Sequence, residues 1–174
     1  ARCDVAVVVS DIAAGLTTYD KSIIDDTVQE GRGLVIAANK WDLVEKDTMT
    51  MKRCEEEIRR ELPDKNGYPV VFISAKTGRR VRDILGIADR IKRSRSFRVP
   101  TAEFNRFIET LPIPPGAGEL AIKYGTQGGT EPPTFVLFMS DPLKVKDSFA
   151  RYAERAIRDA FGFEGTPVRL VFRK

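Results

Sequence analysis

Three polar side chains follow a continuous apolar run in the first half of the chain. Residues 34–38 read Leu-Val-Ile-Ala-Ala, and Asn39, Lys40 and Asp42 come directly after them. An uninterrupted apolar run of this length is typical of a parallel strand that is buried on both faces. Because open α/β sheets place their ligands beyond the carboxyl ends of such strands, we expect these side chains to line a binding site.

The three residue types suit the hydrogen-bonding edge of guanine. One carboxylate, Asp42, can accept from both the ring N1–H and the exocyclic 2-amino group of that base. The Asn39 amide can donate to O6 or N7, or it can tie down a neighbouring loop, while the Lys40 stem can lie along the base plane. Adenine lacks the 2-amino group and would leave the carboxylate partly unpaired, at a cost of about 1–3 kcal/mol. The site is therefore expected to select GTP over ATP.

Composition sets limits on the chemistry that the chain can perform. The 174 residues carry a formal net charge of +4 and include no histidine, so imidazole takes no part in catalysis or metal binding in this chain. The basic surplus weakly favours an anionic partner. The two cysteines, Cys3 and Cys54, lack the spacing of a zinc site or a redox pair and are interpreted as half-buried thiols. No apolar run reaches membrane-spanning length. The chain begins at Ala1 almost directly in an expected strand, so we expect it to be the interior of a longer protein.

Strands and helices alternate over the first 94 residues. This order predicts an α/β fold with a doubly wound parallel sheet, in which helices cover both faces. The expected strands are 4–9, 34–38 and 70–73, and the expected helices are 19–30, 47–61 with Asp47-Thr48 as its cap, and 81–93.

The composition changes between residues 93 and 100, where arginines alternate with serines before a proline. We therefore place a domain boundary there, with residues 95–100 as a basic linker. The second half predicts the order α-β-β-α-β, with the helices on one face of a three-stranded sheet. Its expected elements are a helix capped by Thr101, strands at 120–126 and 134–139, a helix at 145–161 and a strand at 168–172, with a Pro- and Gly-rich segment at 112–118.

Two motifs in the first half resemble those of the Ras-like GTPases. Asn39-Lys40-Trp41-Asp42 is similar to their N-K-x-D guanine-specificity motif, and Ser74-Ala75-Lys76 is similar to their S-A-K motif, one strand and one helix later. The resemblance implies that Ala75 donates its backbone N–H to guanine O6, that Ser74 shapes the turn and that Lys76 covers the base. The alternative is that both are polar strand-end loops of another α/β fold.

The second half narrows the resemblance to the Der (EngA) family of double GTPases in ribosome assembly. The segments that carry it are 123–127, 132–138, 141–142 and 160–169. It implies that residues 1–94 are the C-terminal part of a Ras-like P-loop GTPase domain and that residues 101–174 form a small α+β KH-like domain. Residues 125–128 match the G-x-x-G loop of KH domains in letters, but they lie between two expected strands, so we interpret them as a hairpin turn.

The same resemblance places the catalytic elements upstream of Ala1. The phosphate loop, the switch threonine and the D-x-x-G segment would all precede it, so this chain alone is expected neither to hold GTP tightly nor to hydrolyse it. The implied ligands are GTP or GDP, with Mg²⁺ held by upstream residues. The implied partners are ribosomal RNA, the large ribosomal subunit or its precursor and other assembly factors, but no membrane. The protein would be ribosome-associated, in the cytoplasm of a bacterium or in the mitochondrial matrix or plastid stroma of a eukaryote.

A rival interpretation is a nucleotide-inert module that binds RNA and keeps only the GTPase fold. A weaker one is a GTPase whose second module binds protein. Two groups of arginines are candidates for RNA contact, since phosphate tracking needs several cations within reach of one backbone. The alternatives are a solvated helix face with a flexible linker for the first group and a self-neutralised surface for the second. A set of phenylalanines in the second half is predicted to lie mostly in the core rather than to stack on bases, namely Phe135, Phe138, Phe149, Phe161, Phe163 and Phe172. The candidates are Arg79, Arg80, Arg90, Arg93, Arg95 and Arg98 in the first group and Arg151, Arg155 and Arg158 in the second.

Overall fold

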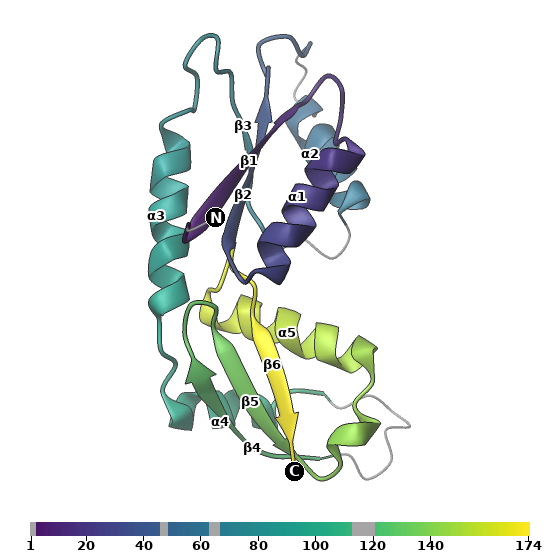
Figure 1. Cartoon of the computed structure of the whole chain (residues 1–174), viewed down its shortest axis with the longest axis vertical. Coiled ribbons are helices and arrows are strands. Elements are labelled where there is room, and N and C mark those ends of the chain that lie inside the picture. The colour runs from purple at the N-terminus through teal and green to yellow at the C-terminus, as the bar shows by residue number, and fades with distance from the viewer. Residues whose placement is uncertain (1–2, 46–48, 63–66, 113–120) are drawn as a thin grey trace. The chain divides into compact units, whose positions relative to one another are not determined.

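A computed structural model of the chain describes residues 3–45, 49–62, 67–112 and 121–174. It divides into two compact units (Figure 1). The first comprises Ala1–Arg93 with Glu164–Thr166, and the second comprises Ser94–Phe163 with Pro167–Lys174. None of the helices that the structure describes combines the length and the apolar composition needed to cross a lipid bilayer.

The first unit is built on a parallel sheet in the order β1-β2-β3, with β2 at its centre. All residues of β2 except the last are buried, as its unbroken apolar sequence predicts. Helices α1 and α2 share one core cluster with β2 through Ile24 and Ile58, whereas α3 packs Ile91 in a second cluster with Val35 and Ala37. The predicted doubly wound arrangement is therefore confirmed. The bounds are β1 (Val5–Asp11), α1 (Thr18–Gln29), β2 (Gly33–Asn39), α2 (Thr50–Glu61), β3 (Val70–Phe72) and α3 (Asp83–Ser96).

Local sequence signals explain where α1 begins and ends. Thr17 and Asp20 form a capping box, in which the Asp20 N–H donates to Thr17 Oγ1 at 3.1 Å and the Thr17 N–H donates to Asp20 Oδ2 at 2.9 Å. After the helix, Gly31 adopts a φ of 73°, which glycine accepts without strain. The expected Asp47-Thr48 cap of the second helix lies outside the described residues, and α2 begins at Thr50.

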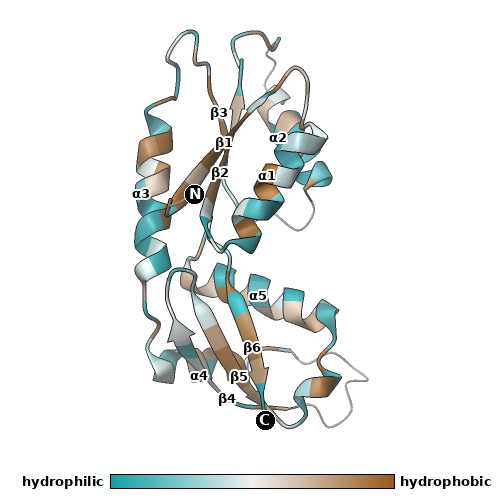
Figure 2. Ribbon diagram, in the orientation of Figure 1, coloured by the Kyte–Doolittle hydropathy of each residue, from teal (hydrophilic) through white to brown (hydrophobic). Residues whose placement is uncertain are grey.

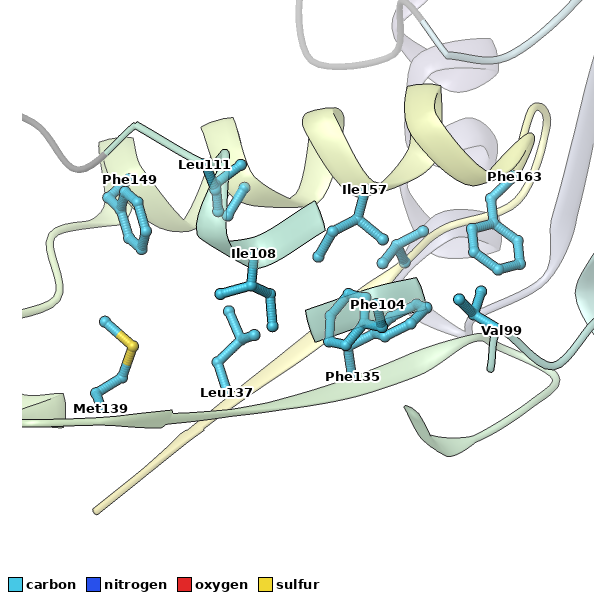
Figure 3. Packing of buried hydrophobic residues seen from close by; sticks show 12 residues of the cluster. Val99, Phe104, Ile108, Leu111, Phe135, Leu137, Met139, Phe149, Ile157 and Phe163 are labelled. Carbon is cyan, nitrogen blue, oxygen red and sulfur yellow. The ribbon is translucent and has the colours of Figure 1, made fainter. Parts of the chain in front are cut away.

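The second unit has the predicted order α-β-β-α-β. Its sheet runs β4-β5-β6, with β4 and β5 antiparallel and β5 and β6 parallel. Figure 3 shows the core of this unit between the sheet and the two helices, with Phe104, Phe135 and Ile157 among the buried side chains. The helices in Figure 2 carry bands of both colours, as expected for helices with one buried face. The bounds are α4 (Thr101–Glu109), β4 (Ile122–Gly129), β5 (Thr134–Met139), the 3₁₀ turn η2 (Pro142–Lys144), α5 (Asp147–Phe161) and β6 (Arg169–Arg173).

The Gly-Thr-Gln-Gly segment is part of a strand, so the hairpin-turn interpretation of residues 125–128 is wrong. Gly125 lies where α4 packs on β4, and a Cβ atom there would overlap the side chains of Ile108 and Phe104. The Gln127 side chain accepts from the Val99 N–H at 2.7 Å and donates to the Phe97 carbonyl at 3.0 Å. These contacts hold the segment in the extended β4, and the turn to β5 falls at residues 130–133 instead.

The end of α3 and the start of α4 also differ from expectation. Residues 95–96, expected in the linker, continue α3, which ends at Ser96. The N-cap of α4 is Pro100 rather than Thr101, and it makes no side-chain cap hydrogen bond. Most of the Pro- and Gly-rich segment 112–118 lies outside the described residues.

Candidate functional site

The loops that follow β2 and β3 interleave at one edge of the first sheet. The two strands are parallel neighbours with Ala38 opposite Phe72, so their carboxyl ends meet. Beyond this pair, the Ile73 N–H donates to the Ala38 carbonyl at 2.9 Å, and the Trp41 N–H donates to the Ile73 carbonyl at 3.0 Å. The residues predicted to form one site therefore share one edge of the sheet.

Asn39 joins the two loops directly. Its Oδ1 atom accepts from the Ala75 N–H at 2.9 Å. The sequence left two roles open for the Asn39 amide, which were donation to the base and attachment of a neighbouring loop. In the structure the amide makes the second of these contacts. The same bond occupies the Ala75 N–H that the family resemblance assigned to guanine O6. That N–H can therefore serve a base only if Asn39 shares it.

Trp41, the variable residue of the N-K-x-D motif, anchors its loop in the core. Its side chain is 4% exposed and packs on Phe72 with the ring centroids 4.7 Å apart. This burial fixes the loop while leaving Lys40 exposed and Asp42 half-buried beside it. The tryptophan is thus a structural support rather than a ligand group.

Ser74 shapes the second loop from a buried position. Its Oγ atom accepts from the Thr77 N–H at 3.1 Å, and its own N–H donates to the Arg79 carbonyl at 3.1 Å. Gly78 has a φ of 75°, the left-handed conformation that the tight turn between Ser74 and Arg79 requires. The side chains of Ala75 and Lys76 are exposed at the tip of the loop. Lys76 is therefore free to lie over a flat ligand.

Asp11, at the end of β1, holds the lysine of the motif. Its Oδ2 atom lies 2.6 Å from Lys40 Nζ, and its Oδ1 atom accepts from the Ala13 N–H at 3.0 Å. The hydrogen bond from Lys40, followed by that from Ala13, keeps the pKa of the Asp11 carboxyl below its ordinary value. Lys40 itself has a φ of 66°, in the left-handed region that few side chains adopt.

Sequence reasoning missed Asp11, although a signal for it exists. In the parallel pairing of β1 with β2, Asp11 stands opposite Asn39. An acidic residue at the carboxyl end of the strand next to the motif is therefore placed to pair with the motif lysine.

A separate pocket lies beside Asp11 and does not include the predicted base-reading residues. Its lining includes Ser10, Leu16, Cys54 and Glu57. Burial, with a smaller contribution from the charge of Glu57, raises the pKa of the Cys54 thiol. In the described part of the chain, no three His, Cys, Asp or Glu side chains gather as they would to hold a metal ion.

The structure removes two arginines from the candidate RNA contacts. Arg95, in the last turn of α3, is 1% exposed, and Arg158, in the last turn of α5, is 7% exposed. The Arg158 side chain forms an ion pair with Glu154 one turn earlier, and the Arg158 carbonyl accepts a hydrogen bond from the Phe163 N–H. Arg95 was predicted to lie in the basic linker and Arg158 on a cationic helix face, but tertiary packing buries both side chains. The exposed candidates are Arg79, Arg80, Arg90, Arg93, Arg98, Arg151 and Arg155.

Comparison with known proteins agrees with the motifs and with the fold. A family model described as the elongation factor Tu GTP binding domain matches residues 1–94. A second model, described as the C-terminal KH-domain-like region of EngA bacterial GTPase enzymes, matches residues 98–173. A solved structure of Era with MgGDPNP and a segment of 16S ribosomal RNA covers 98% of this chain and 64% of its own, at 16% identity and a TM-score of 0.42. That likeness is too low to add to the argument.

Curated relatives match the chain from end to end. GTPase Der of Desulforamulus reducens is 43% identical over 178 residues, which cover 99% of this chain and 40% of the relative. GTPase Der of Pelotomaculum thermopropionicum is 45% identical, with the same two coverages. The chain thus spans about two fifths of the length of the relatives that it matches. The chain belongs to the family of elongation factor Tu GTP-binding domains, whose model matches more than half of it, and over nearly its whole length it is similar to part of GTPase Der (EngA).

Proposed function

We propose that this protein is a GTP-binding ribosome assembly factor that acts in large ribosomal subunit biogenesis. In this proposal the chain supplies the guanine-recognition part of one GTP-binding domain together with the KH-like domain. The observation that carries the proposal is the hydrogen bond from Ala75 to Asn39, which unites the N-K-x-D and S-A-K loops at one edge of the sheet. The names of the relatives support the GTPase activity.

The groups at this edge fit a guanine base. The Asp42 carboxylate offers two acceptor oxygens for the ring N1–H and the 2-amino group. Lys40, held by Asp11 at 2.6 Å, and Lys76 would lie along the two faces of the base. Guanine O6 would share the Ala75 N–H with Asn39, whose side chain keeps the two loops in register. Ser74 shapes the turn from which that N–H points.

The phosphates and the hydrolytic step would depend on residues outside this chain. Mg²⁺, when bound there, would neutralise charge that develops on the transferred phosphoryl group. This chain's contribution would be to orient the nucleotide through its base. The γ-phosphate would then bias one of two arrangements of the protein, so that affinity for the ribosome depends on the nucleotide state.

The partners in this proposal are ribosomal RNA, the large ribosomal subunit or its precursor, and other assembly factors. The seven exposed arginines named above remain candidates for contact with RNA phosphates. The protein would be ribosome-associated, in the cytoplasm if its source is a bacterium. In a eukaryote it would lie in the mitochondrial matrix or the plastid stroma.

Co-sedimentation with purified ribosomal subunits tests the proposal. The complete protein, with its phosphate-binding elements, is loaded with GTP or GDP and mixed with large or small subunits. We expect it to sediment with large subunits in one nucleotide state and to separate from them in the other. Binding that ignores the nucleotide, or that is confined to small subunits, would contradict the proposal.

A further inference from the structure

One face of the sheet in the second unit carries a set of outward-pointing side chains that no site so far described uses. The buried side chains Phe135, Leu137 and Met139 of β5 share the core with α4 and α5, so the alternate positions of the strands point to the opposite side. Figure 3 shows both helices on the core side of the sheet. The set, here called the open face, consists of Tyr124, Val136, Phe138, Arg169, Val171 and Arg173.

Strand register arranges the open face in rows. Tyr124 stands opposite Phe138, and Phe138 stands beside Arg173, so one row holds two aromatic rings and a guanidinium group. The two ring centroids lie 5.9 Å apart, and the ring planes are inclined at 41°. Tyr124 is 45% exposed. Phe138, which was predicted to be core, is half-buried and belongs to this outer row.

The next two rows extend the pattern along the strands. Val136 stands beside Val171, which is 37% exposed, and Thr134 stands beside Arg169. Arg169 and Arg173 therefore mark the two ends of β6, about 13 Å apart for four residues of extended strand, with apolar surface between them. Flat apolar groups are thus bordered by cations at both ends.

The charged residues on the strands of this sheet are all basic. None of the residues of β4, β5 and β6 is Asp or Glu, whereas Lys123, Arg169 and Arg173 are basic and exposed. On the helices, by contrast, acidic residues lie between the basic ones. Arg93 pairs with Asp89 at 2.6 Å, and Arg155 lies 3.8 Å from Asp159. The charge on the strands of the sheet is therefore of one sign, which suits an anionic partner.

We propose that the open face binds single-stranded RNA. Bases would stack on Tyr124 and Phe138, and the backbone phosphates would contact Arg169 and Arg173. Unpaired bases present their ring faces to such a surface, whereas a duplex keeps them stacked inside. A polyanion is favoured over a protein partner, because the strands of this sheet carry basic residues and no acidic ones. This inference rests on the proposed function, since it specifies how that protein would hold ribosomal RNA.

Substitutions at Tyr124 isolate the stacking contribution. The full 174-residue chain is titrated against a labelled single-stranded RNA of about 12 nucleotides, and fluorescence anisotropy reports binding at several salt concentrations. Tyr124→Phe keeps the ring and should bind like the unchanged chain. Tyr124→Leu keeps apolar volume without a π-face and should lower the affinity about 5- to 100-fold, with an unchanged salt slope.

Substitutions of the arginines isolate the phosphate contribution. The double change Arg169→Gln and Arg173→Gln should lower the affinity and reduce the slope of log K against log salt by about 1.4, since each phosphate contact to single strands contributes about 0.7. The matched control is Lys52→Gln with Arg60→Gln on the exposed side of α2, which removes two positive charges away from every candidate RNA contact and should leave both quantities unchanged. Circular dichroism and the thermal midpoint of each variant establish that it is folded.

The outcomes separate this inference from the proposed function. If the open-face variants bind RNA normally and a third variant, Arg151→Gln with Arg155→Gln in α5, loses binding, the open face is not the site, while the ribosomal partner remains supported. If the unchanged chain fails to bind single-stranded RNA at low salt, the inference fails outright. If sedimentation shows that the open face pairs two copies of the chain, and Tyr124→Leu abolishes that pairing without affecting RNA, the face is a protein interface.

Discussion

Replacing Asp42 with Asn should change the base that the protein selects. The carboxylate accepts two hydrogen bonds from guanine in the proposed site, and a hydrogen bond to a charged group contributes about 1.5–3 kcal/mol. The amide would present a donor where guanine also donates. We therefore expect GTP affinity to fall by about 3–6 kcal/mol, a factor of roughly 10² to 10⁴.

Xanthine should recover much of this loss. It carries a carbonyl at the position of the 2-amino group, and that oxygen can accept from the new amide. Because Trp41 is buried and fixes the loop, the substitution should leave the position of residue 42 unchanged. The altered selectivity would then report on hydrogen bonding alone.

The assay uses the complete protein and displacement of a fluorescent guanine nucleotide by GTP or xanthosine triphosphate. The matched control is Asp26→Asn, which makes the same chemical change on the exposed side of α1. The control should keep the preference for GTP. Unchanged GTP affinity in Asp42→Asn, without any gain for xanthosine triphosphate, would refute the proposed contact between Asp42 and the base.

Three further changes test the supports of the site and of the second unit. Asn39→Ala removes the acceptor for the Ala75 N–H and should lower the free energy of unfolding by about 0.5–1.5 kcal/mol in denaturant titration. The same change should also lower the affinity for GTP. If neither quantity changes, the hydrogen bond is not formed in solution. Lys40→Met should raise the pKa of Asp11, measured by NMR titration, because Lys40 is the first cause of its depression. A depressed carboxyl pKa stabilises the folded protein above the ordinary value of about 3.9, and this stabilisation is lost as the pH falls through the pKa of the folded state. The free energy of unfolding of the variant should therefore decrease less than that of the unchanged protein between neutral and acid pH. If the pKa of Asp11 does not move in the variant, the ion pair is contradicted. Gly125→Ala forces a methyl group against Ile108 and Phe104 and should lower the free energy of unfolding by about 1–3 kcal/mol. The control Gly86→Ala in α3, where the new Cβ meets nothing within 4 Å, should raise the free energy of unfolding by about 0.5–1 kcal/mol. Equal effects of the two changes in thermal or chemical unfolding would contradict the packing of α4 on β4.

The first sheet and the loops at its edge could be predicted because their signals are local. An apolar run such as residues 34–38 has few solutions other than a buried strand, and the polar residues after it must emerge at the carboxyl edge. The alternation along β5 likewise predicted the strand Thr134–Met139, whose bounds the structure reproduces.

The features that the sequence did not reveal depend on tertiary contacts. Gly125 resembles a turn residue until α4 is known to press on it, and Arg95 resembles a surface cation until the last turn of α3 is seen to be buried. Asp11 becomes a partner of Lys40 only through the pairing of β1 with β2. In each case a residue far away in the sequence decides the role, and local periodicity carries no information about it.

The most direct test of the account is an experimental structure of the complete protein with GDP bound. We expect one guanine ring between Lys40 and Lys76, with the Asp42 carboxylate within hydrogen-bond distance of N1 and the 2-amino group. We also expect that the Ala75 N–H lies beside O6 while Asn39 still joins the two loops. A base bound at any other edge, or Asp42 turned away from it, would contradict the account.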